Sequence, residues 1–304
     1  MPEKPPANID IDAALAEAVE GYRAANPKSA AQHEAACAAM PGGSTRSSIY
    51  IDPFPLTMAK GEGAHLWDVD GHEYVDFLSE FTAGLYGHSH PAIRKAIDAA
   101  LDGGINFGAH GQAEGKFAAA IRDRFPSIEL VRFTNSGTEA NLMAVSAAIG
   151  ITGKKKILVF RGGYHGGVFY FRGKGSPINA PFDYLMGTYN DMEGVRALVA
   201  PHKGDLAAIL IEPMLGGSGC IPATRDFLAE LRALASETGA ILIFDEVMTS
   251  RLAPGGLQEV HGITPDMTTL GKYVGGGMSF GAFGGRAHLM EWFDPRNKQG
   301  FHHA

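Results

Sequence analysis

The chain has 304 residues, of which 45% are hydrophobic and 19% charged, a composition that can bury a core and argues against disorder. A formal net charge of −7, with Lys154–Lys156 as the longest basic run, argues against a nucleic-acid partner. Two cysteines are too few for a disulfide framework, so we expect a reduced, cytoplasmic location. No apolar stretch reaches the roughly 20 residues of a membrane helix, and the N-terminus lacks the order of a signal peptide.

The N-terminal part predicts helices followed by a small antiparallel element. Residues 12–39 are rich in Ala, Glu, Arg and Lys, which predicts one or two helices interrupted near Pro27. Residues 41–44 read as a loop. Residues 56–78 alternate apolar and polar side chains around Asp70-Gly71, and an Asp-Gly pair in that setting predicts a β-hairpin.

From about residue 91 helical stretches alternate with short apolar runs. The expected helices span 91–102, 112–124 and 138–150, and the runs are Leu130–Thr134, Ile157–Phe160, Leu206–Ile211, Ala240–Phe244 and Met267–Leu270. This alternation predicts an α/β fold, with a mostly parallel sheet covered by helices. Because ligands of such sheets bind at the carboxyl ends of the strands, the residues after each run are candidates for a site.

Two small-residue segments follow the first two runs. Ser136, Gly137 and Thr138 open a helix, where backbone N–H groups and hydroxyls suit a phosphate, although a plain helix N-cap is the alternative. Tyr164 stands within Gly162–Gly167, and glycines allow an aromatic ring to lie flat on a planar ligand. The alternative is an ordinary glycine loop with a surface tyrosine.

Asp245 ends the fourth run, which is otherwise apolar. A buried carboxylate needs a partner, and a protonated pyridine nitrogen would be one. A metal ion or a helix N-terminus could be another partner. No His cluster with metal-ligand spacing accompanies Asp245, so we expect no metal site.

Lys272 follows the last run and precedes three glycines. A partly buried lysine near a cation has a lowered pKa, so its amine can form a Schiff base. A surface lysine is the alternative for this residue alone. Taken together, a phosphate cradle, a stacking ring, an acid and this lysine are the groups that a pyridoxal 5′-phosphate (PLP) enzyme needs.

Five segments in this order resemble the class III aminotransferases of PLP fold type I. They are Asn135–Ala140, Gly163–Gly166, Glu212-Pro213, Asp245–Thr249 and Thr269–Lys272. The similarity runs from about residue 30 onward. It is strongest to the branch that contains the glutamate-1-semialdehyde aminomutases and the β-phenylalanine aminotransferases.

The resemblance implies a role for each candidate residue. Lys272 would bind PLP covalently, Asp245 would pair with the ring nitrogen, and Tyr164 and Val247 would lie on opposite faces of the ring. Ser136, Gly137 and Thr138 would hold the phosphate. Arg46, in the segment 41–46, would bind the substrate carboxylate through two parallel hydrogen bonds. A surface arginine is the alternative there.

The resemblance also implies substrates, partners and domains. Residues 250–256 are similar to those of the β-phenylalanine aminotransferases, so we expect an aromatic β-amino acid as donor, a 2-keto acid such as 2-oxoglutarate as acceptor, and a homodimer. Glutamate-1-semialdehyde aminomutase activity is the alternative. Residues 1–60 would belong to a small domain and 61–304 to the large PLP domain. Relatives normally continue further, so we expect an incomplete small domain, and an inactive truncated fragment is the third possibility.

Overall fold

The computed structural model describes residues 10–105 and 107–302, which divide into two compact units. The first unit comprises 10–79 and 86–102, and the second comprises 80–85 and the described residues from 103 onward. Each unit has its own sheet.

The first unit begins with two helices, α1 (Ile11–Ala25) and α2 (Pro27–Cys37), separated at Asn26. The predicted interruption near Pro27 is thus confirmed. Proline is tolerated at the first position of α2, because an N–H group there would have no acceptor within the helix. Two short 3₁₀ turns, Pro41–Gly43 and Ser47–Ile49, lead to the sheet.

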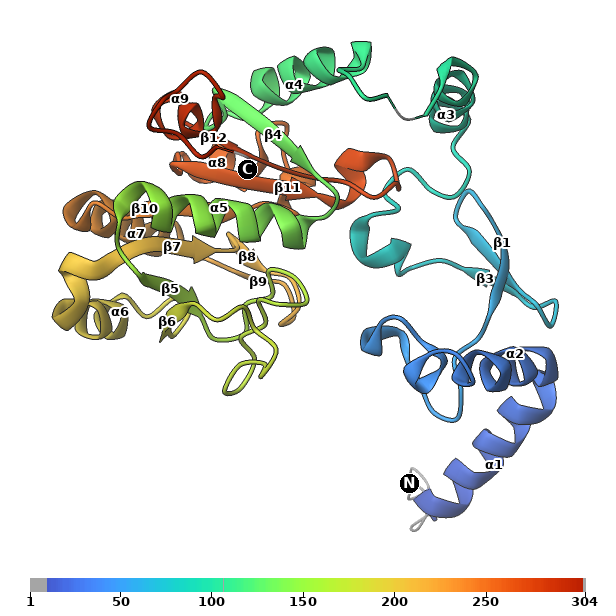
Figure 1. The fold of residues 1–304 in the computed structure, drawn as a ribbon. Helices are drawn as coiled ribbons and strands as arrows, with labels where there is room; N and C mark the ends of the chain where they lie inside the picture. The colour runs from blue at the N-terminus through green and yellow to red at the C-terminus, as the bar shows by residue number, and fades with distance from the viewer. Residues whose placement is uncertain (1–9, 106, 303–304) are drawn as a thin grey trace, which may run out of the picture. The chain divides into compact units, whose positions relative to one another are not determined.

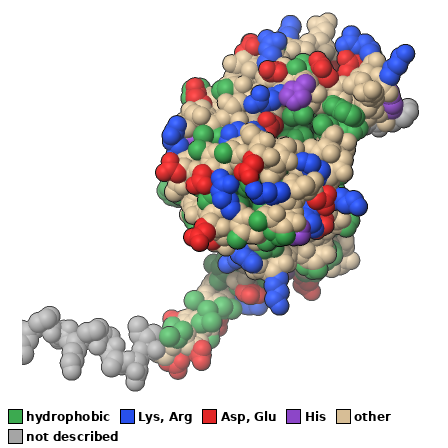
Figure 2. Space-filling view, turned by 90° about the vertical axis from the view of Figure 1, so that its left-hand side faces the viewer, with side chains coloured by type: hydrophobic (Ala, Val, Ile, Leu, Met, Phe, Trp, Pro, Cys, Tyr) green, Lys and Arg blue, Asp and Glu red, His purple; other side chains and the backbone are tan. Residues whose placement is uncertain are grey.

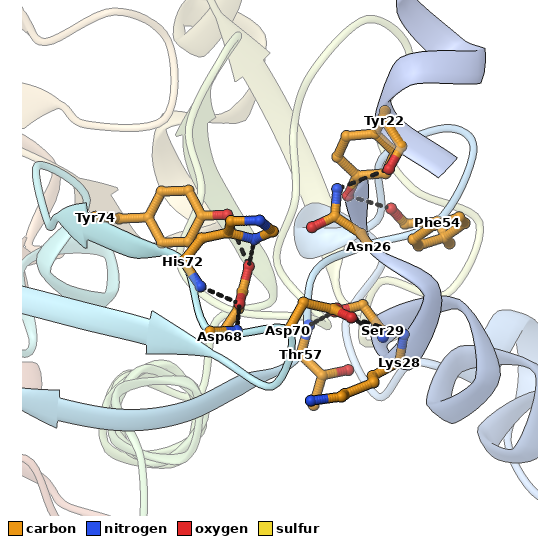
Figure 3. Close-up of polar contacts among 11 residues, drawn as sticks. Tyr22, Asn26, Lys28, Ser29, Phe54, Thr57, Asp68, Asp70, His72 and Tyr74 are labelled. Atoms are coloured by element: carbon orange, nitrogen blue, oxygen red, sulfur yellow. Dashed lines mark hydrogen bonds and ion pairs between the residues drawn. The ribbon is translucent and has the colours of Figure 1, made fainter. Parts of the chain in front are cut away.

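The sheet of the first unit has three antiparallel strands in the order β1 (Met58–Glu62), β2 (His65–Asp68) and β3 (Glu73–Val75). β2 and β3 pair across the predicted Asp-Gly turn. Inside this turn the Asp68 carboxylate accepts hydrogen bonds from the backbone N–H groups of Gly71 and His72, and from the Tyr74 hydroxyl at 2.7 Å (Figure 3). The His72 ring Nδ1 lies 2.9 Å from the same carboxylate.

The turn of this hairpin also caps α2. Asn26 makes no side-chain cap bond; instead Asp70 accepts from the backbone N–H of Lys28 at 2.7 Å and from that of Ser29 at 2.9 Å. The Ser29 hydroxyl donates to Asp70 as well, and Figure 3 shows the three residues together. A carboxylate at a helix N-terminus satisfies N–H groups that the helix itself cannot.

The second unit contains a seven-stranded sheet in the order β4-β12-β11-β10-β7-β5-β6. Its strands are Leu130–Thr134 (β4), Lys156–Phe160 (β5), Asp183–Gly187 (β6), Leu206–Ile211 (β7), Ile241–Asp245 (β10), Met267–Gly271 (β11) and Gly281–Gly285 (β12). β12 runs antiparallel to both of its neighbours, while the pairs from β11 to β6 are parallel. The predicted mostly parallel sheet is therefore confirmed, and a small hairpin of β8 (Met214–Leu215) and β9 (Ile221–Pro222) stands beside it.

All five predicted runs are strands, whereas β6 and β12 were not predicted. β12 does not appear as an apolar run because three of its five residues are glycine. A Cβ at Gly281 would collide with the Ser136 carbonyl oxygen, and one at Gly284 would lie 2.7 Å from the Leu130 carbonyl oxygen. The glycines therefore serve close approach to β4 and the chain that follows it, which the sequence does not reveal.

Helices cover both faces of this sheet (Figure 1). α5 (Gly137–Thr152) packs on one face. Its Ala140, Ala144 and Val145 share a buried cluster with Ile241 and Ile243 of β10. α6 (Met192–Val199) and α7 (Arg225–Thr238) pack on the other. The second unit also contains α4 (Gln112–Arg124), α8 (Gly256–His261) and α9 (Ala287–Met290), whereas α3 (Pro91–Gly103) belongs to the first unit except for its last residue. Burial on both faces explains why the strands are continuous apolar runs.

One face of the molecule is mixed in charge. On the face drawn in Figure 2, acidic and basic side chains are interspersed. Among the helices of the described residues, none combines the length and apolar character needed to cross a membrane.

The buried Asp68 carboxylate should stabilise the first unit. Burial alone would raise the pKa of Asp68, but the hydrogen bonds from Tyr74, His72 and Gly71 outweigh it and hold that pKa well below its ordinary range. Asp68→Asn should lower the free energy of unfolding by about 1–3 kcal/mol. The amide NH₂ of asparagine would face donors that now find an acceptor, so hydrogen bonds would be lost. Urea unfolding at neutral pH measures this loss.

The pH dependence follows from the lowered pKa. The contribution of Asp68 to the free energy of unfolding is complete above its unfolded pKa and disappears as pH falls through the lower folded pKa. The wild type and Asp68→Asn should therefore become equally stable in strong acid. Asp98→Asn, which alters an exposed ion pair with Arg94, is the control and should change little. Equal losses in both variants would contradict the assignment.

Candidate active site

The carboxyl ends of the strands in the second unit surround a cavity of about 180 Å³. Its wall brings together side chains that follow four parallel strands and the N-terminus of α5, and it is lined by Gly137, Thr138, Asn141, Tyr164, His165, Gly166, Glu212, Asp245, Val247, Met248 and Lys272. Six residues proposed from the sequence are in this wall. Ser136 and Arg46 are not.

Asp245 ends β10 and is 4% exposed. Its Oδ2 accepts from the Asn141 side-chain amide at 2.8 Å, and its Oδ1 accepts from the Val247 backbone N–H at 3.0 Å. The ring Nδ1 of His165 lies 2.8 Å from Oδ2. An ionised carboxylate only accepts, so Nδ1 carries the hydrogen in this pair. Three donors thus hold one buried acid on the cavity wall.

Lys272 directly follows β11 and has a left-handed backbone, with φ of 53°. Burial lowers the pKa of its amine; the negative charges of Asp245 and Glu212 act in the opposite direction, and the positive charge of Arg251 lowers it further. A lowered pKa increases the fraction of neutral amine, which is the nucleophilic form.

The N-terminus of α5 lies at the cavity wall and carries a side-chain cap. Ser136 is its N-cap, and the Ser136 Oγ accepts from the Glu139 backbone N–H at 3.1 Å. The helix cannot satisfy the N–H groups of Gly137 and Thr138 internally, and both residues lie in the cavity wall. The N-cap interpretation of Ser136 is therefore confirmed, while the anion-binding interpretation stays a prediction.

Close packing shapes the wall around this helix end. A Cβ at Gly166, whose φ is 122°, would collide with the Thr138 hydroxyl. A Cβ at Gly137 would lie 2.8 Å from Val247 Cγ2, and one at Gly271 would lie 3.2 Å from Val247 Cγ1. A side chain at Gly166 or Gly137 would therefore force Thr138 or Val247 to move, and one at Gly271 would press on Val247.

Tyr164 and Glu212 are linked through the backbone. The buried Glu212 carboxylate accepts from the Tyr164 N–H at 2.9 Å and from the Gly216 N–H at 3.1 Å. Burial raises the pKa of Glu212, the His165 charge opposes this, and the Asp245 charge adds to it. The Tyr164 side chain is 48% exposed and meets the Tyr170 ring edge-on, with 5.7 Å between the centroids.

Sequence reasoning did not assign roles to Asn141, His165 or Glu212. His165 lies in a segment noticed for Tyr164, and Glu212 in the quoted segment Glu212-Pro213, for which no role was given. Alternation offers a signal for His165, because in an extended segment it points opposite to Tyr164, into the protein. Arg46 belongs to the first unit, where it is exposed and exchanges backbone hydrogen bonds with the Ser44 hydroxyl. Its role stays a prediction.

The donor set fits the expected cofactor. The wall offers a buried acid for a ring nitrogen, an amine of lowered pKa and a helix N-terminus for a phosphate. Glycines keep the space between them open. Among the described residues, no group of three His, Cys, Asp or Glu side chains could hold a metal ion.

Replacing Gly166 should close this space. Gly166→Ala would press a methyl group onto Thr138 in a backbone conformation that favours glycine, and should cost about 1–3 kcal/mol of stability and weaken PLP binding. Gly167→Ala is the matched control, because nothing lies within 4 Å of its Cβ position. Calorimetry and PLP titration measure both effects, and equal behaviour of the two variants would refute the argument.

Comparison with known proteins agrees with this site. The family described as "Aminotransferase class-III" matches residues 48–303. The chain is 58% identical over 286 residues to the β-phenylalanine transaminase of Variovorax paradoxus, covering 94% of this chain and 66% of that protein. It is 43% identical over 293 residues to a glutamate-1-semialdehyde 2,1-aminomutase of Rhodopirellula baltica, covering 90% and 67%.

Among solved structures, the β-phenylalanine aminotransferase from Variovorax paradoxus matches with a TM-score of 0.92 and 57% identity, over 94% of this chain and 67% of that one. The chain therefore spans about two thirds of the length of these relatives. The matched region contains the whole cavity wall described above. The chain belongs to the class-III aminotransferases, a family of PLP-dependent enzymes with the fold found here.

Proposed function

We propose that this protein is an aminotransferase that moves the amino group of an aromatic β-amino acid to a 2-keto acid such as 2-oxoglutarate. The observation that carries the proposal is the meeting of Lys272 and the hydrogen-bonded Asp245 in one cavity. The 58% identity to a β-phenylalanine transaminase supports the choice of donor.

We propose the following roles for the cavity residues. Lys272 binds PLP covalently through Nζ, and Asp245 pairs with the ring nitrogen. Tyr164 and Val247 contact the two faces of the ring.

The phosphate would be held at the N-terminus of α5. There the N–H groups of Gly137 and Thr138 have no acceptor within the helix and suit an anion. The Ser136 oxygen acts as an acceptor in the helix cap, so its hydroxyl hydrogen remains available to the phosphate.

When bound, PLP supplies an electron sink for charge that develops at the amine-bearing carbon. The protein residues support this chemistry. Three donors hold the Asp245 carboxylate in place, and its negative charge would keep a ring nitrogen protonated. Burial lowers the pKa of Lys272, so its Nζ would be the base that takes the proton from the amine-bearing carbon and the acid that delivers it to C4′ of the cofactor.

Arg46 is the proposed group for the substrate carboxylate, because a guanidinium binds carboxylate through two parallel N–H bonds. We also propose that the chain acts as a homodimer in the cytoplasm, and that 1–60 belongs to a small domain and 61–304 to the large one. These proposals rest on the family resemblance.

Covalent attachment at Lys272 is directly testable. After reconstitution with PLP and borohydride reduction, mass spectrometry should find the label on Lys272, and Lys272→Ala should lose it. Because burial lowers the pKa of this amine, attachment should persist at a lower pH than for an exposed lysine. The control is Lys156→Ala, since Lys156 is the first residue of β5 and the cavity lies at the other ends of the strands. This variant should keep the label, whereas a label on another lysine would refute the assignment.

The donor test separates the two activities found among the relatives. With 2-oxoglutarate present, β-phenylalanine should yield glutamate, and Arg46→Ala should raise KM for the donor roughly tenfold or more, since a charge-assisted hydrogen bond is lost. Arg94→Ala, an exposed arginine of the same unit, should leave KM unchanged. Conversion of glutamate 1-semialdehyde without a keto acid, and none of the β-amino acid, would replace the proposal with aminomutase activity.

A further inference from the structure

A chain of hydrogen bonds leads from Asp245 away from the cavity. Asn141 donates through Nδ2 to Asp245 Oδ2 at 2.8 Å and to the His165 backbone carbonyl at 3.1 Å. The Asn141 Oδ1 accepts from the Thr269 hydroxyl at 2.8 Å. Thr269 is absent from the cavity wall.

The fold places these residues beside one another. Asp245 and Thr269 are register partners on the parallel strands β10 and β11, so their side chains leave the sheet on the same face. Asn141 lies on α5, which covers that face. The exposed fractions are 4% for Asp245, 1% for Asn141 and 0% for Thr269, so the hydroxyl of Thr269, which does not line the cavity, has no access to solvent.

The orientation of the Asn141 amide depends on Thr269. Both hydrogens of Nδ2 point at acceptors, so a rotated amide would set Oδ1 against the Asp245 carboxylate and the His165 carbonyl oxygen. The Thr269 hydroxyl, by donating to Oδ1, stabilises the orientation in which Asp245 receives an N–H group. Without that donor, Oδ1 would be a buried acceptor with no partner, which is costly.

We infer that Thr269 is a positioning residue for the cofactor acid: its hydroxyl fixes the Asn141 amide, which holds Asp245 where it pairs with the PLP ring nitrogen. The inference rests on the proposed function, because it concerns the same site. Asp245 Oδ2 is occupied by Asn141 and His165, whereas among the described residues Oδ1 accepts only from Val247. Acceptor capacity for a ring N–H therefore remains on Oδ1.

A neighbouring residue provides a matched control. Thr268 is also 0% exposed and lies one position earlier on β11, so its side chain leaves the opposite face of the sheet. Its hydroxyl lies 2.7 Å from the Ser127 hydroxyl and accepts from the Gln258 amide at 3.2 Å. Thr268→Val therefore removes a buried, hydrogen-bonded hydroxyl from the same strand without touching Asn141.

The experiment uses the whole chain reconstituted with PLP. Thr269→Val should raise the dissociation constant for PLP about tenfold, the expected size for one misplaced hydrogen bond to a charged group. It should also move the NMR signal of PLP labelled at the ring nitrogen towards the unprotonated value. Thr269→Ser should restore both quantities. Thr268→Val should lower the melting temperature about as much as Thr269→Val does. It should leave the PLP dissociation constant and the ring-nitrogen signal at their wild-type values.

A double-mutant cycle distinguishes action through Asn141 from a general effect on the core. In the Asn141→Ala background Thr269→Val should have no further effect on PLP affinity or on the ring-nitrogen signal, because the two residues act in series. Additive effects, or a Thr269→Val protein that matches Thr268→Val in both readouts, would overturn the inference while leaving PLP binding at Lys272 intact. A wild-type chain that fails to attach PLP at Lys272 would overturn the proposed function and this inference together.

Discussion

The Asp245 carboxylate is buried at the end of a hydrophobic strand, where an ionised group is costly unless donors surround it. Asn141 on α5, His165 on the loop after β5 and the Val247 backbone supply those donors. Each comes from a different segment, so the same hydrogen bonds that stabilise the acid also fix the relative positions of the helix, the loop and the strand. The geometry of the cavity depends on this one buried acid.

The second constraint is close backbone approach around that acid. Val247 can contact both Gly137 and Gly271 because neither has a side chain, and Gly166 can pass Thr138 for the same reason. The high glycine content, 40 of 304 residues, is thereby partly explained. Glycines here do not mark flexibility; they allow three strand-end segments to reach one small volume.

The sequence was most informative where a local pattern determines structure. The Asp70-Gly71 turn, the helix break at Pro27 and the apolar runs of the sheet follow from turn chemistry and burial, and the structure confirms them. β12 could not be predicted, because its glycines reflect neighbours that are distant in sequence. That Lys272 and Asp245 line one cavity was predictable, because strand ends of a parallel sheet converge.

The support around Asp245 was not predictable in the same way. Asn141 and Asp245 are separated by 104 residues, and Thr269 and Asn141 by 128. Neither pair has a local signature, because amides and hydroxyls serve equally well as helix caps, turns or surface groups. Ser136 illustrates the same ambiguity at short range, since capping the helix and presenting a hydroxyl to a phosphate require the same residue.

Lys272 has a left-handed backbone, which lowers stability but fixes the direction of its side chain. For a residue with a Cβ this conformation costs about 1–2 kcal/mol, and glycine avoids most of that cost. Selection for stability alone would therefore favour glycine at position 272, as it has at the nearby Gly276 and Gly277, whose φ values are 63° and 92°. That a lysine stands there indicates that the direction of its side chain, set by this strained backbone, matters more to the protein than the stability it forgoes.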